Sequence, residues 1–334
     1  MKYETFLNEV KEQMQHELGE GYSLTLRRVP KNNGLILDGL CITKGSENVA
    51  PAIYLNPCYI QYRDGRAIGD IVKELMALYQ ANRTPPDMDY SRLSHYDEMK
   101  SQVACKLIHA ASNQALLKDI PHVPWMDLAI VFYLCIHEDE TGLMTAMINR
   151  QHMDIWDISL EELRRTALDN TPRLFPPVIS SMDCMIEDMN EAALAGDGDS
   201  SLCGDGLPGG GMSGDGMSGD GMSGFGLPDP DVSSPFYVLS NISGINGAAC
   251  ILYRDVVKNF ADGMEKDIII LPSSIHEVLL LPDEEGISCD EMSRLVTHIN
   301  QTEVPKEDRL SNQVYHYSRI HQTIALASSS LAPI

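Results

Sequence analysis

The chain has 334 residues, 43% of them apolar, and 25 Lys and Arg against 48 Asp and Glu give it a net charge of −23. This length and apolar content predict a soluble globular protein of about two domains, with enough apolar surface to bury real cores. Because a strongly acidic chain repels phosphate backbones and anionic lipid, we expect neither nucleic acid nor membrane surfaces as partners.

Residues 1–86 are predicted to form an N-terminal module. Apolar side chains recur at helical spacing in some segments and alternate with polar ones in others, which is the pattern of a half-buried strand. In chain order the pattern predicts a helix ended by Gly19 and Gly21, a hairpin over 22–43 turned by Asn33 and Gly34, a strand over 52–55, and a helix over 68–79.

Residues 87–194 are predicted to form a middle α+β segment. In order, it contains an apolar run over 103–110, a short helix near 113–120, and strands over 127–136 and 143–149. A helix then begins at Ser159, because Glu162 completes the pattern of a capping box, in which each side chain meets an orphan backbone N–H. Asn170 and Pro172 are predicted to end this helix.

Residues 232–326 are predicted to form a C-terminal α+β segment that packs with the middle one, before a tail over 327–334. Its pattern predicts a strand over 236–241, a stretch over 247–264 that is helical in its second half, strands over 267–271 and 275–281, a helix from Ser288, and a strand over 313–320. Ser288 and Glu291 form a second capping-box pattern. Helices and strands mixed in this way predict an α+β fold of mostly antiparallel sheets flanked by helices.

Residues 195–231 form an insertion rich in Gly, Ser and Asp, with a tandem GMSGD repeat. It has almost no large side chains to offset the ordering entropy of its glycines, so we expect a disordered, flexible linker. Calcium binding by Asp215 and Asp220 is the alternative, because Gly-Asp repeats also form β-rolls. The period of five does not match the nonapeptide repeat of that roll, which favours the linker.

The eight cysteines and the first segment bear on the compartment. No two cysteines are spaced as C-x-x-C, and a chain of this length needs no disulfide staples, so we expect reduced packing thiols and neither a metal nor a cofactor. Residues 1–18 carry acids where an export signal has an uninterrupted apolar run, and no run reaches the ~18 apolar residues of a membrane span. These features predict a cytoplasmic protein.

The stretch IIILPSSIHEVLLLP, residues 268–282, is the main candidate for a catalytic segment because it sets polar groups between two apolar runs. In the enzymatic interpretation, Ser273 or Ser274 is a nucleophile, His276 is its base, and Glu277 orients the base.

Strand geometry argues against this triad. A strand over 275–281 would place His276 and Glu277 on opposite faces of a sheet, so the two side chains could not act as a unit. The zinc-protease pattern H-E-x-x-H also fails, because Leu280 stands where its second histidine is required. The alternative is that Pro272 and the two serines turn the chain between two buried strands.

His137 and Glu138 form a second Ile-His-Glu tripeptide, again at the end of an apolar strand. The two tripeptides could converge on a metal or a substrate if their strand ends face each other. The alternative is that each is a solvated turn.

Two other histidines stand near the two tryptophans of the chain. His122 lies close to Trp125 in sequence, and His152 lies close to Trp156. Packing of the indoles is the simpler interpretation, and a ligand pocket is the alternative.

Several motifs together resemble a family of bacterial proteins from gut anaerobes that is described only as a domain of unknown function. They are KNNGLILDGL, IPHVPWMDLAIVFYL, HMDIWDISLEELRRTALDNTPRLFPP, YVLSN with GAACILY, and LPSSIHEVLLLP. The likeness runs from the first helix to about residue 320 and departs at the Gly-Asp repeat. It implies a bacterial cytoplasmic protein and supplies no activity, cofactor or catalytic residue.

These observations predict a non-enzymatic binding or regulatory protein. We expect it to engage another protein or a small ligand in a cleft between its segments. The alternative is a hydrolase or metal-dependent enzyme that uses His276 and Glu277 with His137. An acidic decoy for a basic partner is a third possibility.

Overall fold

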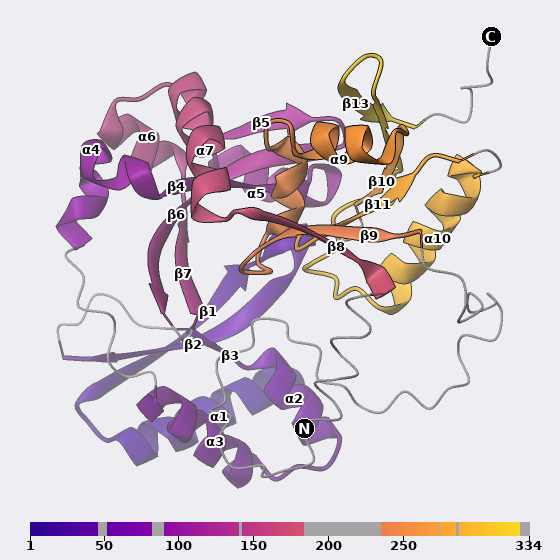
Figure 1. The fold of residues 1–334 in the computed structure, drawn as a ribbon. Coiled ribbons are helices and arrows are strands. Elements are labelled where there is room, and N and C mark those ends of the chain that lie inside the picture. Colours follow the sequence, from indigo (N-terminus) through magenta and orange to yellow (C-terminus); the bar gives the residue numbers. More distant parts are fainter. Residues whose placement is uncertain are drawn as a thin grey trace, which may run out of the picture. The chain divides into compact units, whose positions relative to one another are not determined.

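The computed structural model describes residues 1–45, 52–81, 90–139, 142–183, 235–272, 274–284 and 287–327 (Figure 1). The side chains of residues 90, 91, 137–139 and 142 lie outside this description. So do the predicted insertion over 195–231 with Asp215 and Asp220, Ser273, and all but the first residue of the predicted tail. The chain divides into two compact units, Met1–Arg92 and Leu93–Ile334.

The first unit is a small antiparallel sheet packed with helices. Its elements are α1 (Tyr3–Leu18), β1 (Tyr22–Pro30), the 3-10 turn η1 (Asn32–Gly34), β2 (Ile36–Lys44), β3 (Ala52–Tyr54), α2 (Asn56–Arg63) and α3 (Ile68–Ala81), with strand order β1-β2-β3. The predicted hairpin is confirmed, and its turn has the positive φ expected of Asn33 (56°) and Gly34 (67°). Helix α2 was not predicted; none of its residues is fully buried, and Cys58, Tyr59 and Tyr62 pack only partly buried against the core.

One apolar core holds the first unit together. Phe6, Val10 and Met14 from α1 pack with Leu40 of β2 and Leu75 of α3. The apolar stripes of the helices thus cover one face of the sheet, as their sequence periods require.

The second unit contains the remaining elements. They are α4 (Tyr96–Met99), η3 (Lys100–Gln102), β4 (Val103–His109), η4 (Ala111–Asn113), α5 (Gln114–Asp119), β5 (His122–Trp125), β6 (Leu128–Asp139), β7 (Gly142–Met147), α6 (Arg150–Trp156), α7 (Leu160–Leu174), β8 (Pro177–Ser181), β9 (Tyr237–Asn241), η5 (Gly247–Leu252), α9 (Val256–Met264), β10 (Ile268–Leu271), β11 (Val278–Pro282), α10 (Cys289–Thr302), β12 (Tyr315–Ser318) and β13 (Thr323–Leu326). The 3-10 turn η2 (Tyr90–Ser94) crosses the boundary between the units.

Two sheets organise the second unit. In the first, β6 pairs with β4 along one edge and with β5 and then β7 along the other. The second sheet has the strand order β13-β12-β10-β11-β9-β8. Every strand pair in the described residues is antiparallel, so the predicted α+β class with antiparallel sheets is confirmed.

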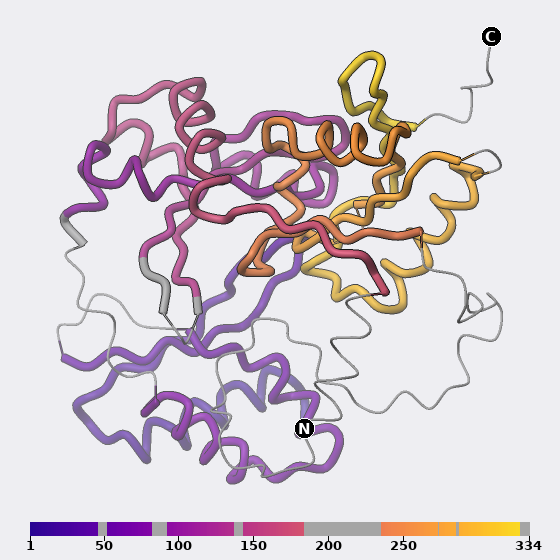
Figure 2. The backbone as a smooth tube through the Cα atoms, viewed as in Figure 1, coloured from indigo at the N-terminus to yellow at the C-terminus, as the bar shows by residue number. Residues whose placement is uncertain are grey.

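A single large core joins the two sheets of the second unit. It contains Leu107 and Phe132 from the first sheet, Ile270 and Leu280 from the second, and Leu163 from α7. The middle part of the chain, magenta in Figure 2, therefore runs beside the orange-to-yellow C-terminal part within this unit.

The predicted end of the helix at Asn170 and Pro172 is wrong, because α7 continues to Leu174 with the proline inside it. Tertiary contacts explain the continuation. The Asn170 amide donates to the carbonyl oxygens of Lys100 and Val103, at 2.6 and 3.1 Å, so it ties α7 to the start of β4 instead of stopping the helix. The predicted start is confirmed, since Ser159 Oγ accepts from the Glu162 N–H at 3.1 Å.

No helix in the described ranges is both long and apolar enough to cross a bilayer.

Candidate functional site

The segment around His276 is a bend and not a strand, which corrects the first three residues of the strand predicted over 275–281. Strand β11 begins only at Val278. Before it, the Ile275 N–H donates to the Asp308 carbonyl oxygen at 2.7 Å, and Ser274 forms an isolated bridge with Arg309. The alternation argument therefore does not apply to His276 and Glu277, because no sheet assigns their side chains to opposite faces.

Both ring nitrogens of His276 have partners. The Asn246 N–H donates to Nδ1 at 3.3 Å, and Nε2 lies 3.3 Å from Asp308 Oδ1. Because a neutral imidazole has one donor and one acceptor nitrogen, the first contact assigns the proton to Nε2, which then donates to Asp308.

Ser274 lies beside the same residues but meets the backbone of His276. Its Oγ accepts from the His276 N–H at 2.9 Å, and Ser274 lies close enough to Glu277 to lower the pKa of that carboxyl against the larger effect of burial. The structure thus brings Ser274, His276 and Glu277 together and adds Asp308, which sequence reasoning missed. The carboxylate on the imidazole is that of Asp308, not Glu277.

His137 lies in β6, paired with Met144 just past an irregularity in the strand. Its side chain, like Ser273, falls outside the described residues, so its part in a shared site stays a prediction. In the portion of the chain that the structure describes, no group of three or more His, Cys, Asp and Glu side chains is arranged to hold a metal ion.

The bend around His276 makes stability depend on pH. The hydrogen bond from His276 to Asp308 raises the pKa of the imidazole above 6.5, while burial opposes that rise. A raised histidine pKa stabilises the fold fully below pH 6.5, and this stabilisation is lost as the pH rises through the folded-state pKa. We expect the free energy of unfolding to fall over that window, measured by urea denaturation.

Variants test this pH dependence. His276→Gln and Asp308→Asn should both flatten the profile above about pH 6, whereas His298→Gln, exposed on α10, should follow the parent. Burial also raises the pKa of Glu277, so the free energy of unfolding falls as the pH rises through the titration of this carboxyl too. This second decrease is expected in the parent and in all three variants. If the free energy of unfolding of both His276→Gln and Asp308→Asn falls with pH as steeply as that of the parent, the hydrogen bond from His276 to Asp308 is not the cause of the pH dependence.

The two tryptophans have different surroundings. Trp156 is buried, donates from Nε1 to the Leu93 carbonyl oxygen at 2.8 Å, and stacks on His152 at 5.5 Å. His152 Nδ1 accepts from the Asn149 N–H, so this histidine caps α6, and its packing interpretation is confirmed. Trp125 packs edge-on against Tyr315 at 5.6 Å, and its indole faces a cavity.

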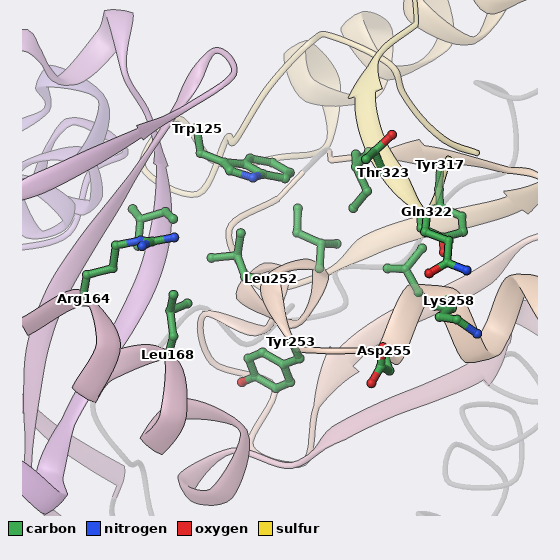
Figure 3. Close-up of a pocket in the computed structure, with 14 residues that line it drawn as sticks. Trp125, Arg164, Leu168, Leu252, Tyr253, Asp255, Lys258, Tyr317, Gln322 and Thr323 are labelled. Atoms are coloured by element: carbon green, nitrogen blue, oxygen red, sulfur yellow. The ribbon is translucent and has the colours of Figure 1, made fainter. Parts of the chain in front are cut away.

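This cavity has a volume of about 430 Å³ and lies within the second unit (Figure 3). We call it the cleft. Its wall comes from β5, β6 and α7 of the middle segment and from η5, α9, β12 and β13 of the C-terminal segment, with the loops beside them. The lining residues are Trp125, Ile130, Arg164, Leu168, Ile251, Leu252, Tyr253, Asp255, Val257, Lys258, Tyr317, Gln322, Thr323 and Ile324.

The cleft combines an apolar floor with polar groups at its ends. In Figure 3, Trp125, Leu168 and Leu252 stand between Arg164 at one end and the group of Lys258 and Gln322 at the other. Among known ligand sites this is the usual composition, with apolar surface for affinity and a few polar groups that fix orientation.

Backbone strain also gathers at the cleft. Asp255 and Gln322 line it with φ values of 62° and 52°, and Met126, next to Trp125, has a φ of 53°. A side chain at positive φ costs free energy, least for Asp and more for Met and Gln. Such strained positions concentrate at sites of binding and catalysis, so their place around the cleft supports it as the candidate site.

Comparison with known proteins gave one family. The family model described as "Family of unknown function (DUF5688)" matches residues 3–319. Neither the curated proteins nor the solved structures gave a match. The expected resemblance to an uncharacterised family is confirmed over almost the whole chain.

Proposed function

Because the chain belongs to DUF5688, a family of unknown function, we propose its function from its own geometry: it is a non-enzymatic protein that binds a small ligand in the cleft. The single observation that carries the proposal is the cavity of about 430 Å³ with Trp125 facing into it. Proteins bind small molecules in concave sites of roughly 300–1,000 Å³ lined mainly by apolar and aromatic side chains.

Two segments far apart in sequence form the cleft, so a bound ligand should stabilise the packing between them. A ligand that touches both Trp125 and Leu252 adds its binding free energy to the packing of the middle segment against the C-terminal one. The contacts of His276 favour this function over the hydrolase alternative. Its two ring nitrogens are occupied by Asn246 and Asp308, so neither is aimed at the Ser274 hydroxyl.

We also propose that the protein is bacterial and cytoplasmic. The resemblance of its motifs to a family from gut anaerobes supports a bacterial source. Cys105 and Cys250 are buried thiols outside any disulfide, as in a reducing compartment.

Trp125 offers a direct test of binding. The chain has two tryptophans, so Trp156→Phe leaves Trp125 as the only indole. We expect a probe with an apolar ring, 4-phenylbutanamide, to change the emission of Trp125 in a saturable way, because the ring displaces water beside the indole. Fluorescence titration measures the change.

A matched pair of variants locates the binding. Leu168→Phe places a larger ring in the cleft and should weaken the probe, whereas Leu160→Phe, on the same helix but 39% exposed and outside the cleft, should not. No saturable change with the probe, or equal binding to both variants, overturns the proposal.

A further inference from the structure

The two ends of the cleft differ in how their charges are balanced. At one end, Lys258 pairs with Asp262, and Asp255 brings a negative charge of its own to the wall. Asp262 also pairs with Arg319 at 3.3 Å, and Asp255 lies 3.5 Å from the exposed Arg254, so each of these cations has a carboxylate partner.

At the other end, Arg164 is only partly satisfied. Its Nη1 lies 3.1 Å from Glu161 Oε1, an ion pair between exposed side chains on α7. Its Nε is buried and has no hydrogen-bond partner. A buried donor without an acceptor costs free energy, so an acceptor supplied from the cleft would be favoured there.

The shape of the guanidinium group indicates which acceptor fits. Its donors form a rigid planar fork that matches the two oxygens of a carboxylate. Because Glu161 occupies Nη1, the edge made by Nε and Nη2 is the part of the fork left for a ligand. The side chain is 40% exposed, and Arg164 is one of the residues that line the cleft.

The apolar wall begins beside this cation. Trp125 and Leu168 lie near Arg164 in the wall of the cleft (Figure 3). A carboxylate held by Arg164 therefore has apolar surface within reach of the rest of the molecule.

We propose that the ligand of the cleft is an amphipathic carboxylate, whose anionic group binds Arg164 and whose apolar body lies against Trp125 and Leu168. This inference rests on the proposed function and adds its ligand class. The chain as a whole repels anions at a net charge of −23, so the local fork, and not the general field, supplies the attraction.

The test compares two probes of the same shape, 4-phenylbutanoate and 4-phenylbutanamide, with the Trp156→Phe chain. Hydrogen bonds to charged groups are worth about 1.5–3 kcal/mol, so the carboxylate should bind at least about tenfold more tightly than the amide. Arg164→Gln should abolish this preference. Lys258→Gln, at the balanced end, should keep it.

The outcomes separate the two proposals. Equal affinity for both probes, or a preference for the carboxylate that persists in Arg164→Gln, contradicts the proposed ligand class. Either result is still consistent with binding of a small ligand in the cleft. Binding of neither probe overturns the function itself. Thermal melting shows whether Arg164→Gln is folded, and the comparison of probes on the parent chain decides the question even if that variant is not.

Discussion

Asp127→Ala is expected to lower the free energy of unfolding by about 3–5 kcal/mol, because it removes a half-buried carboxylate on which two hydroxyl groups depend. Ser311 Oγ donates to one oxygen at 2.6 Å, and Tyr315 Oη donates to the other at 2.7 Å. Tyr315 is fully buried. The alanine leaves both hydroxyls without this acceptor, and the loss exceeds that of the bonds alone because the buried donors stay desolvated.

Guanidinium denaturation measures the effect, and Asp119→Ala is the control. Asp119 is exposed at the end of α5, so its removal should change stability by no more than about 0.5 kcal/mol. Tyr315→Phe should lose about 1–2 kcal/mol, because it deletes only one of the two donors. An Asp127→Ala chain within 1 kcal/mol of the parent would refute the role assigned to this carboxylate.

Asp127→Ala should also weaken ligand binding in the cleft. Asp127 belongs to the turn that follows Trp125, and the Tyr315 ring it holds packs edge-on against that indole. Losing the anchor frees both rings at once. We therefore expect Asp127→Ala to weaken binding of the phenyl probes even where the chain remains folded.

Three local signals in the sequence predicted local structure correctly. The Asn33-Gly34 turn, and the caps at Ser159 and Ser288, depend on residues within four positions of each other. Such features follow from backbone dihedrals and orphan N–H groups, which a short stretch of sequence specifies.

Contacts between distant residues could not be predicted in this way. Asp308, the partner of His276, lies 32 positions away, and Tyr315 lies 188 positions from Asp127. The start of the strand predicted over 275–281 was wrong for the same reason, although β11 covers Val278–Pro282. The Ile275 N–H bonds to the Asp308 backbone instead of a neighbouring strand, and nothing local in the sequence encodes that partner.

The cleft was anticipated only in part. Trp125 stood out beside His122, and a cleft between segments was expected, but its other walls come from elements brought together by folding. Arg164 in particular looks like any charged residue on the polar face of a helix. Its unpaired Nε becomes visible only when the packing around α7 is known.

Gly247→Ala is expected to destabilise the fold by at least about 3 kcal/mol or to prevent folding, because three backbone segments meet at this glycine. The glycine begins η5. A Cβ there would lie 2.9 Å from the Asn241 nitrogen and closer still to Ser240 Oγ and the His276 carbonyl oxygen. Two of these neighbours are backbone atoms, and the third, Ser240 Oγ, donates to one of them, the His276 carbonyl oxygen, at 2.7 Å, so none can yield cheaply.

Gly263→Ala provides a control of opposite sign. Gly263 lies in α9, and a Cβ there would meet nothing within 4 Å, so alanine should stabilise the chain by about 0.5–1 kcal/mol through helix propensity. Thermal and guanidinium unfolding measure the stability of both variants. A Gly247→Ala chain as stable as the parent would contradict the close packing of backbone atoms around Gly247. Because η5 carries Ile251 and Leu252 into the cleft, any folded Gly247→Ala protein should also bind the phenyl probes less tightly.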